Sequence, residues 1–229
     1  NLTHSGGFTL IAASSPPGEL DVKSSDAAAE IRVAVLGEWV PSQLADVLAL
    51  QRAEEPETTA TLVGWTATAS MQELPGNRFD LALSTAAWQW PNWECEPLWH
   101  STLAVAVAKR SHLLAYGEVP CQEVLKQPLI CAQSTTDESW RAVAQHVFSD
   151  ELQRREQVVD TFDVAMTLVA AGYGIAIAPA ARLAGYRSHG IAARPLAGAP
   201  AIVMAYLLRP CTSLNESQER FIQRARSMS

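Results

Sequence analysis

The stretch Leu168-Val-Ala-Ala-Gly-Tyr-Gly-Ile-Ala-Ile-Ala-Pro179 gives the clearest indication of how this chain folds. It has three parts: the apolar end of a helix, a turn at Gly172, and a short buried strand closed by Pro179. The uncharged run 164–181 around it is long enough to raise the question of a membrane span. The two glycines and the proline inside it favour a helix, a turn and a strand. We therefore expect no membrane partner and an α/β fold.

The first third of the chain alternates in the same way. Compact apolar runs predict strands at 31–36, 59–63 and 79–83, and helical spacing predicts helices at 41–54 and 66–74 between them. This β-α-β-α-β order is the signature of a parallel sheet covered by helices.

The pattern changes after a Trp- and Pro-rich loop at 88–93. Later strands are predicted at 103–108, 129–132, 158–159, 175–178 and 202–208, and helices at 118–125, 135–149 and 162–171. Strand 103–108 alternates bulky and small residues. Ser213-Leu-Asn-Glu216 has the spacing of a capping box, which predicts a final helix reaching about residue 226.

Composition restricts the class of protein. The 229 residues carry a net charge of -7 and are 48% hydrophobic, which supports a folded core and argues against this chain itself binding nucleic acid. Residues 1–29 are rich in Gly, Pro and Ser without periodicity, so we expect a linker or tail. The four cysteines show no paired spacing, which favours a reduced, cytoplasmic protein, with two disulfides as the alternative.

Motifs for catalysis or metal binding are missing from the sequence. There is no nucleophile elbow, no zinc-protease motif and no His or Cys cluster, and Gly172-Tyr173-Gly174 lacks the third glycine of a dinucleotide fingerprint. We expect no catalytic residue, no metal and no cofactor. The enzyme alternative rests on Glu38 and Asp160 as an acid and base pair.

The candidate binding residues follow the predicted strands. In a parallel sheet, ligands bind beyond the carboxyl ends of the strands, near helix N-termini. The residues predicted there are Gly37, Glu38, Trp39, Thr66, Ala67, Thr68, Ser84, Thr85, Gln133, Ser134, Thr135 and Thr161, with Asp160 beside the last. Their hydroxyls and backbone amides suit a small polar or anionic group, although Ser and Thr also cap helices.

Six of the seven tryptophans lie between Trp39 and Trp99. Trp39 and Trp65 flank two of the candidate loops, and Trp88 and Trp90 follow a third. Two interpretations stay open, an aromatic ligand pocket and packing in the core.

With strands and loops placed, residues 31–227 resemble the effector-binding domain of LysR-type transcriptional regulators. The similar segments are Ile31-Arg-Val-Ala-Val, Glu54-Glu-Pro, Phe79-Asp-Leu-Ala-Leu83, Gln127-Pro-Leu-Ile130 and, most specifically, Leu168–Pro179, which is similar to the family's LVAAGLGIALLP. Their order and spacing carry the resemblance.

The resemblance implies a type-2 periplasmic-binding-protein fold, in which two Rossmann-like α/β lobes are joined by two crossover strands and hold an effector between them. Lobe I would comprise 31–103 and 206–229, and lobe II 104–205, with crossings near 103–105 and 204–207. Ala67, Glu38 and Trp39 depart from the small polar residues frequent in the family's effector loops. These departures point away from an ordinary carboxylate effector.

The resemblance also implies a function. The chain would sense a small-molecule effector as part of a homodimer or tetramer, and DNA would be bound only through an N-terminal winged helix-turn-helix that is absent from this sequence. The alternative is a periplasmic solute-binding protein of the same fold.

Overall fold

The computed structural model describes residues 30–37, 39–65, 78–133, 143–144, 147–148, 156–198 and 200–228. The elements are β1 (Glu30–Leu36), α1 (Gln43–Glu54), β2 (Thr59–Trp65), β3 (Leu81–Ser84), β4 (Trp93–Ala108), the 3-10 helix η1 (His112–Ala115), α2 (Cys121–Val124), β5 (Leu129–Ala132), β6 (Glu156–Val159), α4 (Phe162–Ala171), β7 (Ala176–Pro179), α5 (Ala180–Ala184), the 3-10 helix η4 (Arg187–His189), β8 (Ile191–Pro195), β9 (Ile202–Pro210) and α6 (Glu216–Ser227). The predicted tail 1–29, the predicted helix 66–74 and most of the predicted helix 135–149 lie outside the described residues.

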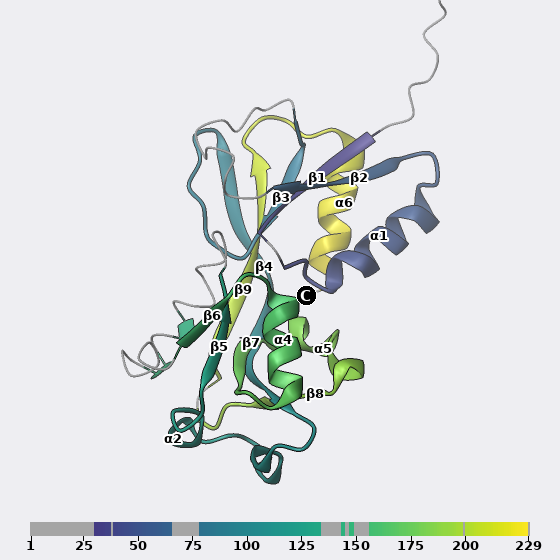
Figure 1. The fold of residues 1–229 in the computed structure, drawn as a ribbon. Coiled ribbons are helices and arrows are strands. Elements are labelled where there is room, and N and C mark those ends of the chain that lie inside the picture. Colours follow the sequence, from purple (N-terminus) through teal and green to yellow (C-terminus); the bar gives the residue numbers. More distant parts are fainter. Residues whose placement is uncertain are drawn as a thin grey trace, which may run out of the picture.

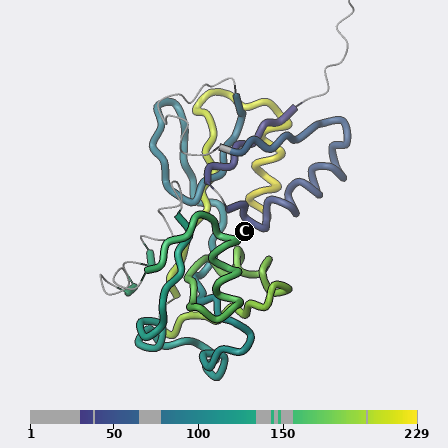
Figure 2. The backbone as a smooth tube through the Cα atoms, viewed as in Figure 1, coloured from purple at the N-terminus to yellow at the C-terminus, as the bar shows by residue number. Residues whose placement is uncertain are grey.

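Two α/β lobes lie one above the other in Figure 1, and β4 and β9 run through both. We call the group β1, β2, β3, α1 and α6 the first lobe, and the group β5 to β8 with α2, α4 and α5 the second lobe. The chain reaches the second lobe after β3 and returns to the first through β9. The tube in Figure 2 shows this path, with the yellow C-terminal segment packed beside the blue α1.

The sheet of the first lobe confirms the predicted parallel arrangement. Its strand order begins β2-β1-β3, with both pairs parallel, and β9 then joins β3 in antiparallel pairing. The alternation of β1 explains its two covered faces. Ile31, Val33 and Val35 pack in the core under α1 and α6, whereas Ala34 and Leu36 face a second core beside the tryptophan loop.

Strand β4 is longer than the sequence predicts. The predicted loop 88–93 ends at Asn92, which has φ 62°, and the strand begins at Trp93, ten residues before the predicted start of strand 103–108. Glu94, Glu96 and Pro97 made this segment resemble a loop. Pro97 has no N–H for the ladder, and the register with β9 shifts between Pro97 and Trp99, so a bulge accommodates the proline inside the strand.

The same strand changes partners where it enters the second lobe. Residues 93–102 pair with β9, and residues 103–108 pair with β7 and β8. The alternation of bulky and small residues predicted for 103–108 is confirmed. Leu103, Val105 and Val107 fill one core, and Ala104 and Ala106 lie under α4 and α5, where small side chains let the helices pack close to the sheet.

The turn at the C-terminal end of α4 is confirmed. Gly172 is the C-cap, with φ 87° in the left-handed region that favours glycine, and its amide hydrogen bonds back to the helix. Gly174 is required for another reason. A Cβ built at this position lies 2.4 Å from the carbonyl oxygen of Pro128, because the backbone of the turn packs directly against the segment before β5.

Three details of the secondary structure differ from prediction. The capping box of α6 consists of Asn215 and Gln218, not of Ser213 and Glu216: the Asn215 side chain accepts from the Gln218 amide and the Gln218 side chain accepts from the Asn215 amide. Both tetrads fit a capping box, and the helix begins at the second. The helix predicted at 118–125 is reduced to the single turn of α2, and α5, η4 and β8 were not predicted.

A network of charged side chains joins α1 to α6. Arg224 is 7% exposed and binds Glu54, Glu55 and the side chain of Gln51, and Arg220 binds Glu55 as well. Removing one partner of such a buried arrangement leaves the other charges unpaired, which is more costly than the pairing is stabilising. This network fixes α6 against α1.

The substitution Gly174→Ala tests the tight turn. Because the added Cβ would meet backbone, the turn must move, and we expect a loss of about 1–3 kcal/mol in the free energy of unfolding measured with urea. Gly117→Ala is the matched control, since a Cβ there meets nothing within 4 Å. Equal stability of the two variants would contradict the close approach.

The α1–α6 network also predicts an acid dependence of stability. The pKa of Glu55 is lowered to about 2, first by its hydrogen bond from Arg220 and then by Arg224. Because this pKa is depressed relative to an ordinary glutamate, the stabilisation is complete above about pH 4.5 and is lost as the pH falls towards 2. Glu55→Gln should therefore be less stable at neutral pH and should lose less on acidification. Urea unfolding across this range, with the exposed Glu57→Gln as control, measures the difference.

Candidate functional site

The predicted binding residues that the structure describes lie where the two lobes meet. In the first lobe, Leu36 pairs with Ser84, which places Gly37 and Thr85 at the same edge of the sheet. In the second lobe, β5 and β6 are parallel and the Gln133 amide donates to the carbonyl of Val159 at 2.6 Å. The carboxyl ends of these strands and the N-terminal ends of α1 and α4 all point towards the middle of the molecule (Figure 1).

Ser84 is buried, and its hydroxyl is engaged within the protein. Its Oγ accepts from the indole Nε1 of Trp88 at 2.8 Å and from the amide of Ala86 at 3.0 Å. Both acceptor positions are therefore used, and the hydroxyl hydrogen remains as the group that Ser84 can donate. Thr85 follows it, 5% exposed.

The tryptophans of the first lobe pack mainly against protein. Trp39 is 8% exposed, so of the two open interpretations its position supports core packing. Trp88 stacks on Trp90, and Trp90 meets Trp93 edge to face, with ring centroids 6.3 Å and 6.1 Å apart. This aromatic cluster adjoins the second core of the first lobe, and the hydrogen bond to Ser84 connects it to the edge of the sheet.

The second lobe contributes polar groups that remain exposed. Thr161 caps α4, with its hydroxyl accepting from the amide of Val164 at 3.3 Å. The other amides of the first turn lie beside it, and a helix N-terminus favours negative or hydrogen-bond-accepting groups. Asp160 and Gln133 are exposed next to this turn, and the structure shows no hydrogen bond to the Gln133 side chain within the described residues.

Several predicted residues have no described position. Glu38, Thr66, Ala67, Thr68, Ser134 and Thr135 lie outside the described residues, as does the side chain of Trp65. The acid and base pair of the enzyme alternative includes Glu38, so its geometry is not described either.

Sequence reasoning missed Ser101. This serine lies in β4, 8% exposed, at the end of the segment that pairs with β9, and its hydroxyl accepts from the amide of Ala181 in α5 at 3.2 Å. It therefore connects a crossover strand to the second lobe. The polar run His100-Ser-Thr102 directly before the apolar run 103–108 was the signal that could have found it.

The arrangement offers hydrogen-bond donors and acceptors. Among the described residues, no three His, Cys, Asp or Glu side chains gather as a metal site would require. Hydroxyls, an amide side chain and a helix N-terminus at the meeting of two lobes suit the binding of a small polar molecule.

Solved structures with this fold include effector-binding domains of transcriptional regulators. The effector-binding domain of BenM with its effector benzoate superimposes with a TM-score of 0.75 at 19% identity, covering 87% of this chain and 91% of that chain. Full-length CbnR in complex with its target DNA superimposes with a TM-score of 0.74 at 20% identity, covering 88% of this chain and 71% of that chain. A full-length OxyR variant from Pseudomonas aeruginosa superimposes with a TM-score of 0.72 at 13% identity, covering 88% of this chain and 65% of that chain.

These likenesses define the fold as the type-2 periplasmic-binding-protein-like fold of such domains, as predicted. The family model described as the LysR substrate binding domain matches residues 24–229, and the chain therefore belongs to this family. Curated proteins give no significant sequence match.

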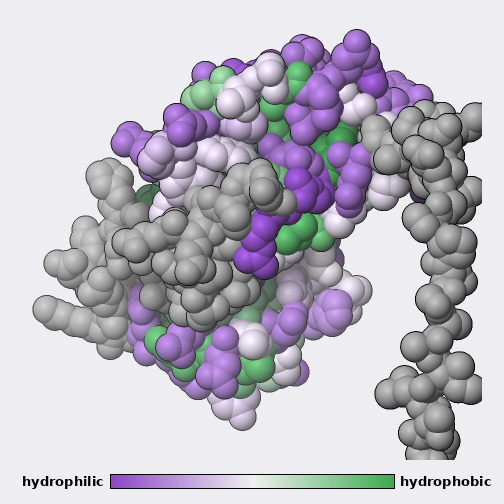
Figure 3. Space-filling view, turned by 90° about the horizontal axis from the view of Figure 1, so that it is seen from above, coloured by the Kyte–Doolittle hydropathy of each residue, from purple (hydrophilic) through white to green (hydrophobic). Residues whose placement is uncertain are grey.

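The helices and one face of the described residues can be compared with what a membrane span requires. Within the described residues, each helix is too short or too polar to cross a bilayer. Figure 3 shows mostly hydrophilic residues over the described part of this face, with apolar residues in small separate areas.

Substituting Ser84 tests its role at the sheet edge. Ser84→Ala leaves the Trp88 indole N–H and the Ala86 amide without their acceptor, so we expect a loss of about 1–3 kcal/mol in unfolding free energy. Ser213→Ala is the control, because this exposed serine is outside the observed capping box, and its cost should stay within about 0.5 kcal/mol. Urea unfolding followed by tryptophan fluorescence measures both. A neutral Ser84→Ala would mean that water replaces the hydroxyl.

Proposed function

We propose that this chain senses a small-molecule effector, held where the two lobes meet, as the regulatory domain of a LysR-type transcriptional regulator. One observation supports this most directly. The strand ends of the first lobe and the capped N-terminus of α4 in the second face the same region, in a chain that belongs to the LysR substrate binding domain family.

The proposed binding set combines described and undescribed residues. From the first lobe it takes Gly37, Ser84 and Thr85, where Ser84 acts as a donor because its acceptor positions are filled. From the second it takes Gln133, Thr161 and the first-turn amides of α4. We also assign to it Glu38, Thr66, Ala67, Thr68, Ser134 and Thr135, and leave out Trp39, which packs in the core.

The mechanism we propose is a change in the arrangement of the lobes. We take 31–103 with 206–229 as one moving body and 104–205 as the other, so that the covalent connections are β4 and β9. A hinge movement that bends these two strands disturbs less packing than a movement that slides the residues of a core past one another. An effector that touches both bodies favours the closed arrangement in proportion to its difference in affinity for the two states.

The rest of the regulator follows from this role. We propose a cytoplasmic homodimer or tetramer without enzymatic activity, whose DNA contacts are made by an N-terminal winged helix-turn-helix. The acidic balance of this chain supports that division, because a net charge of -7 repels phosphate. The alternative function, a periplasmic solute-binding protein of the same fold, has no support from the family match.

The test is thermal stabilisation together with small-angle scattering. Benzoate, the effector in the BenM structure, is the first probe, followed by a panel of polar and aromatic metabolites. A true effector should raise the melting temperature and decrease the radius of gyration. Gln133→Ala should weaken its binding about fivefold through one lost hydrogen bond. Gln122→Ala, exposed elsewhere in the second lobe, is the control.

Two outcomes would contradict the proposal. One is a folded protein that no compound of the panel stabilises. The other is a compound that binds with no change in the scattering curve and equal affinity for both glutamine variants.

A further inference from the structure

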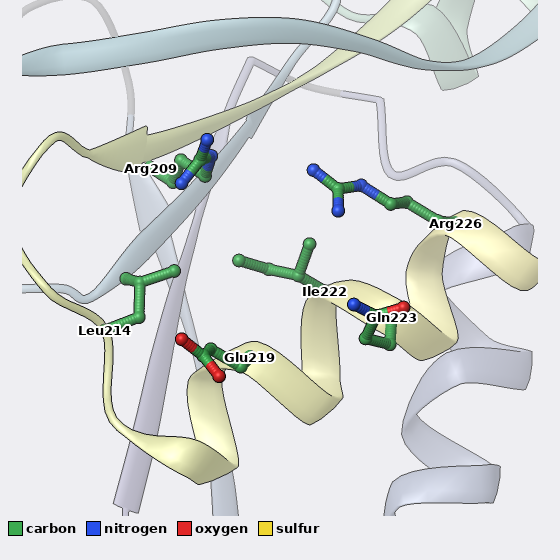
Figure 4. A pocket seen from close by; sticks show the side chains of 6 residues that line it. All are labelled: Arg209, Leu214, Glu219, Ile222, Gln223 and Arg226. Carbon is green, nitrogen blue, oxygen red and sulfur yellow. The ribbon is translucent and has the colours of Figure 1, made fainter.

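The first lobe has a cavity on α6, away from the predicted effector residues. Its volume is about 290 Å³, and it is lined by Arg209, Leu214, Glu219, Ile222, Gln223 and Arg226 (Figure 4). The helical members recur at intervals of three and four residues, so α6 presents them on one side. None of the binding residues predicted from the sequence lines this cavity.

Two arginines occupy one side of the cavity. Figure 4 shows the guanidinium groups of Arg209 and Arg226 on the same side of the cavity as each other, above Ile222. Arg226 holds the carboxylate of Glu96 through Nε and Nη2, at 2.8–3.2 Å. Arg209 holds Glu94 through Nη2 across the strand pair β4–β9. These bonds fix both planar groups and leave the Nη1 donors unused among the described residues.

Arg209 also has a hydrogen-bond donor without an acceptor. Its Nε is buried and has no hydrogen-bond partner among the described residues. A buried N–H without an acceptor is unfavourable, but this Nε has almost no accessible surface, so a carboxylate in the cavity meets the accessible part of the guanidinium group instead. A carboxylate is the acceptor that best matches a guanidinium.

The charges around the cavity exclude a simple anion as its best ligand. Glu94 and Glu96 already balance the two arginines, and Glu219 adds a third carboxylate on the opposite side, where Figure 4 shows it rising from α6 near Leu214. The cavity thus offers donors on one side, an acceptor on the other, and the apolar Leu214 and Ile222 between them. A ligand with charges of both signs satisfies this lining.

We propose that the cavity is a binding site for an α-amino acid with an apolar side chain. The ligand carboxylate binds the arginine donors, the ammonium group binds Glu219, and the side chain lies against Leu214 and Ile222. The volume restricts the site to a small ligand, because it is just below the usual range for ligand pockets. This site is independent of the proposed effector site.

Calorimetric titration with L-leucine tests the assignment. We expect saturable binding to one site. The analogue 4-methylpentanoate, which lacks the amino group, and 3-methylbutylamine, which lacks the carboxylate, should each bind about tenfold more weakly, because each loses one charged contact. Equal binding of leucine and either analogue would overturn the proposal, and so would the absence of leucine binding up to its solubility limit.

Variants assign the contacts to residues. Glu219→Gln should weaken leucine about fivefold and leave 4-methylpentanoate unchanged, since it removes only the partner of the ammonium group. Glu216→Gln, on the same helix but outside the lining, is the matched control. Gln223→Trp keeps every charge, lies at an exposed helical position, and should abolish binding by filling the cavity.

Further measurements separate this site from the effector site. Circular dichroism checks that each variant is folded, and Gln133→Ala should bind leucine as the unaltered chain does. Leucine binding that is lost in Gln133→Ala and retained in Gln223→Trp would place the amino acid between the lobes and overturn the second site. That result would leave the proposed effector function intact.

Discussion

The pairing of β4 with β9 is the constraint on which the rest of the structure depends. These two antiparallel strands are shared by both lobes, and the main sheet of each lobe is built outwards from them. Trp99 anchors the pair in the first lobe. It is 1% exposed, and its indole N–H donates to the carbonyl of Ala225 in α6 at 2.9 Å, so the crossover strand and the last helix share one core. A polar group buried at this depth needs its partner, and the main chain near the C-terminal end of α6 provides it.

The place of the candidate residues was easier to predict than the role of each one. Strand ends are readable from sequence, because an apolar run stops at Leu36, Ser84, Ala132 and Val159 almost where the strands do. What a hydroxyl does there is not readable, because it depends on partners distant in space. Ser84 receives an indole N–H from a loop, and Thr161 caps its own helix, so both serve the fold before any ligand.

Much of the fold followed from local patterns, and the errors have local causes. Buried strands and the Gly172 turn are specified by apolar runs and by backbone conformation. Strand 93–102 was missed because a partly exposed segment with Glu94, Glu96 and Pro97 lacks the alternation that identifies a half-buried strand. The capping box was misplaced by two residues because Ser213 and Asn215 both suit an N-cap, and the packing of α6 against α1 determines which one is used.

The order in which the lobes acquire their strands has a consequence for synthesis on the ribosome. The first lobe contains β1, yet its sheet and core are incomplete without β9 and α6, which are translated after the second lobe. The second lobe is encoded almost without interruption between them. We therefore expect the second lobe to reach a native-like state first, while the apolar residues of β1 to β3 stay exposed. For a nascent chain, this is the period in which chaperone binding to the segment β1–β3 would matter most.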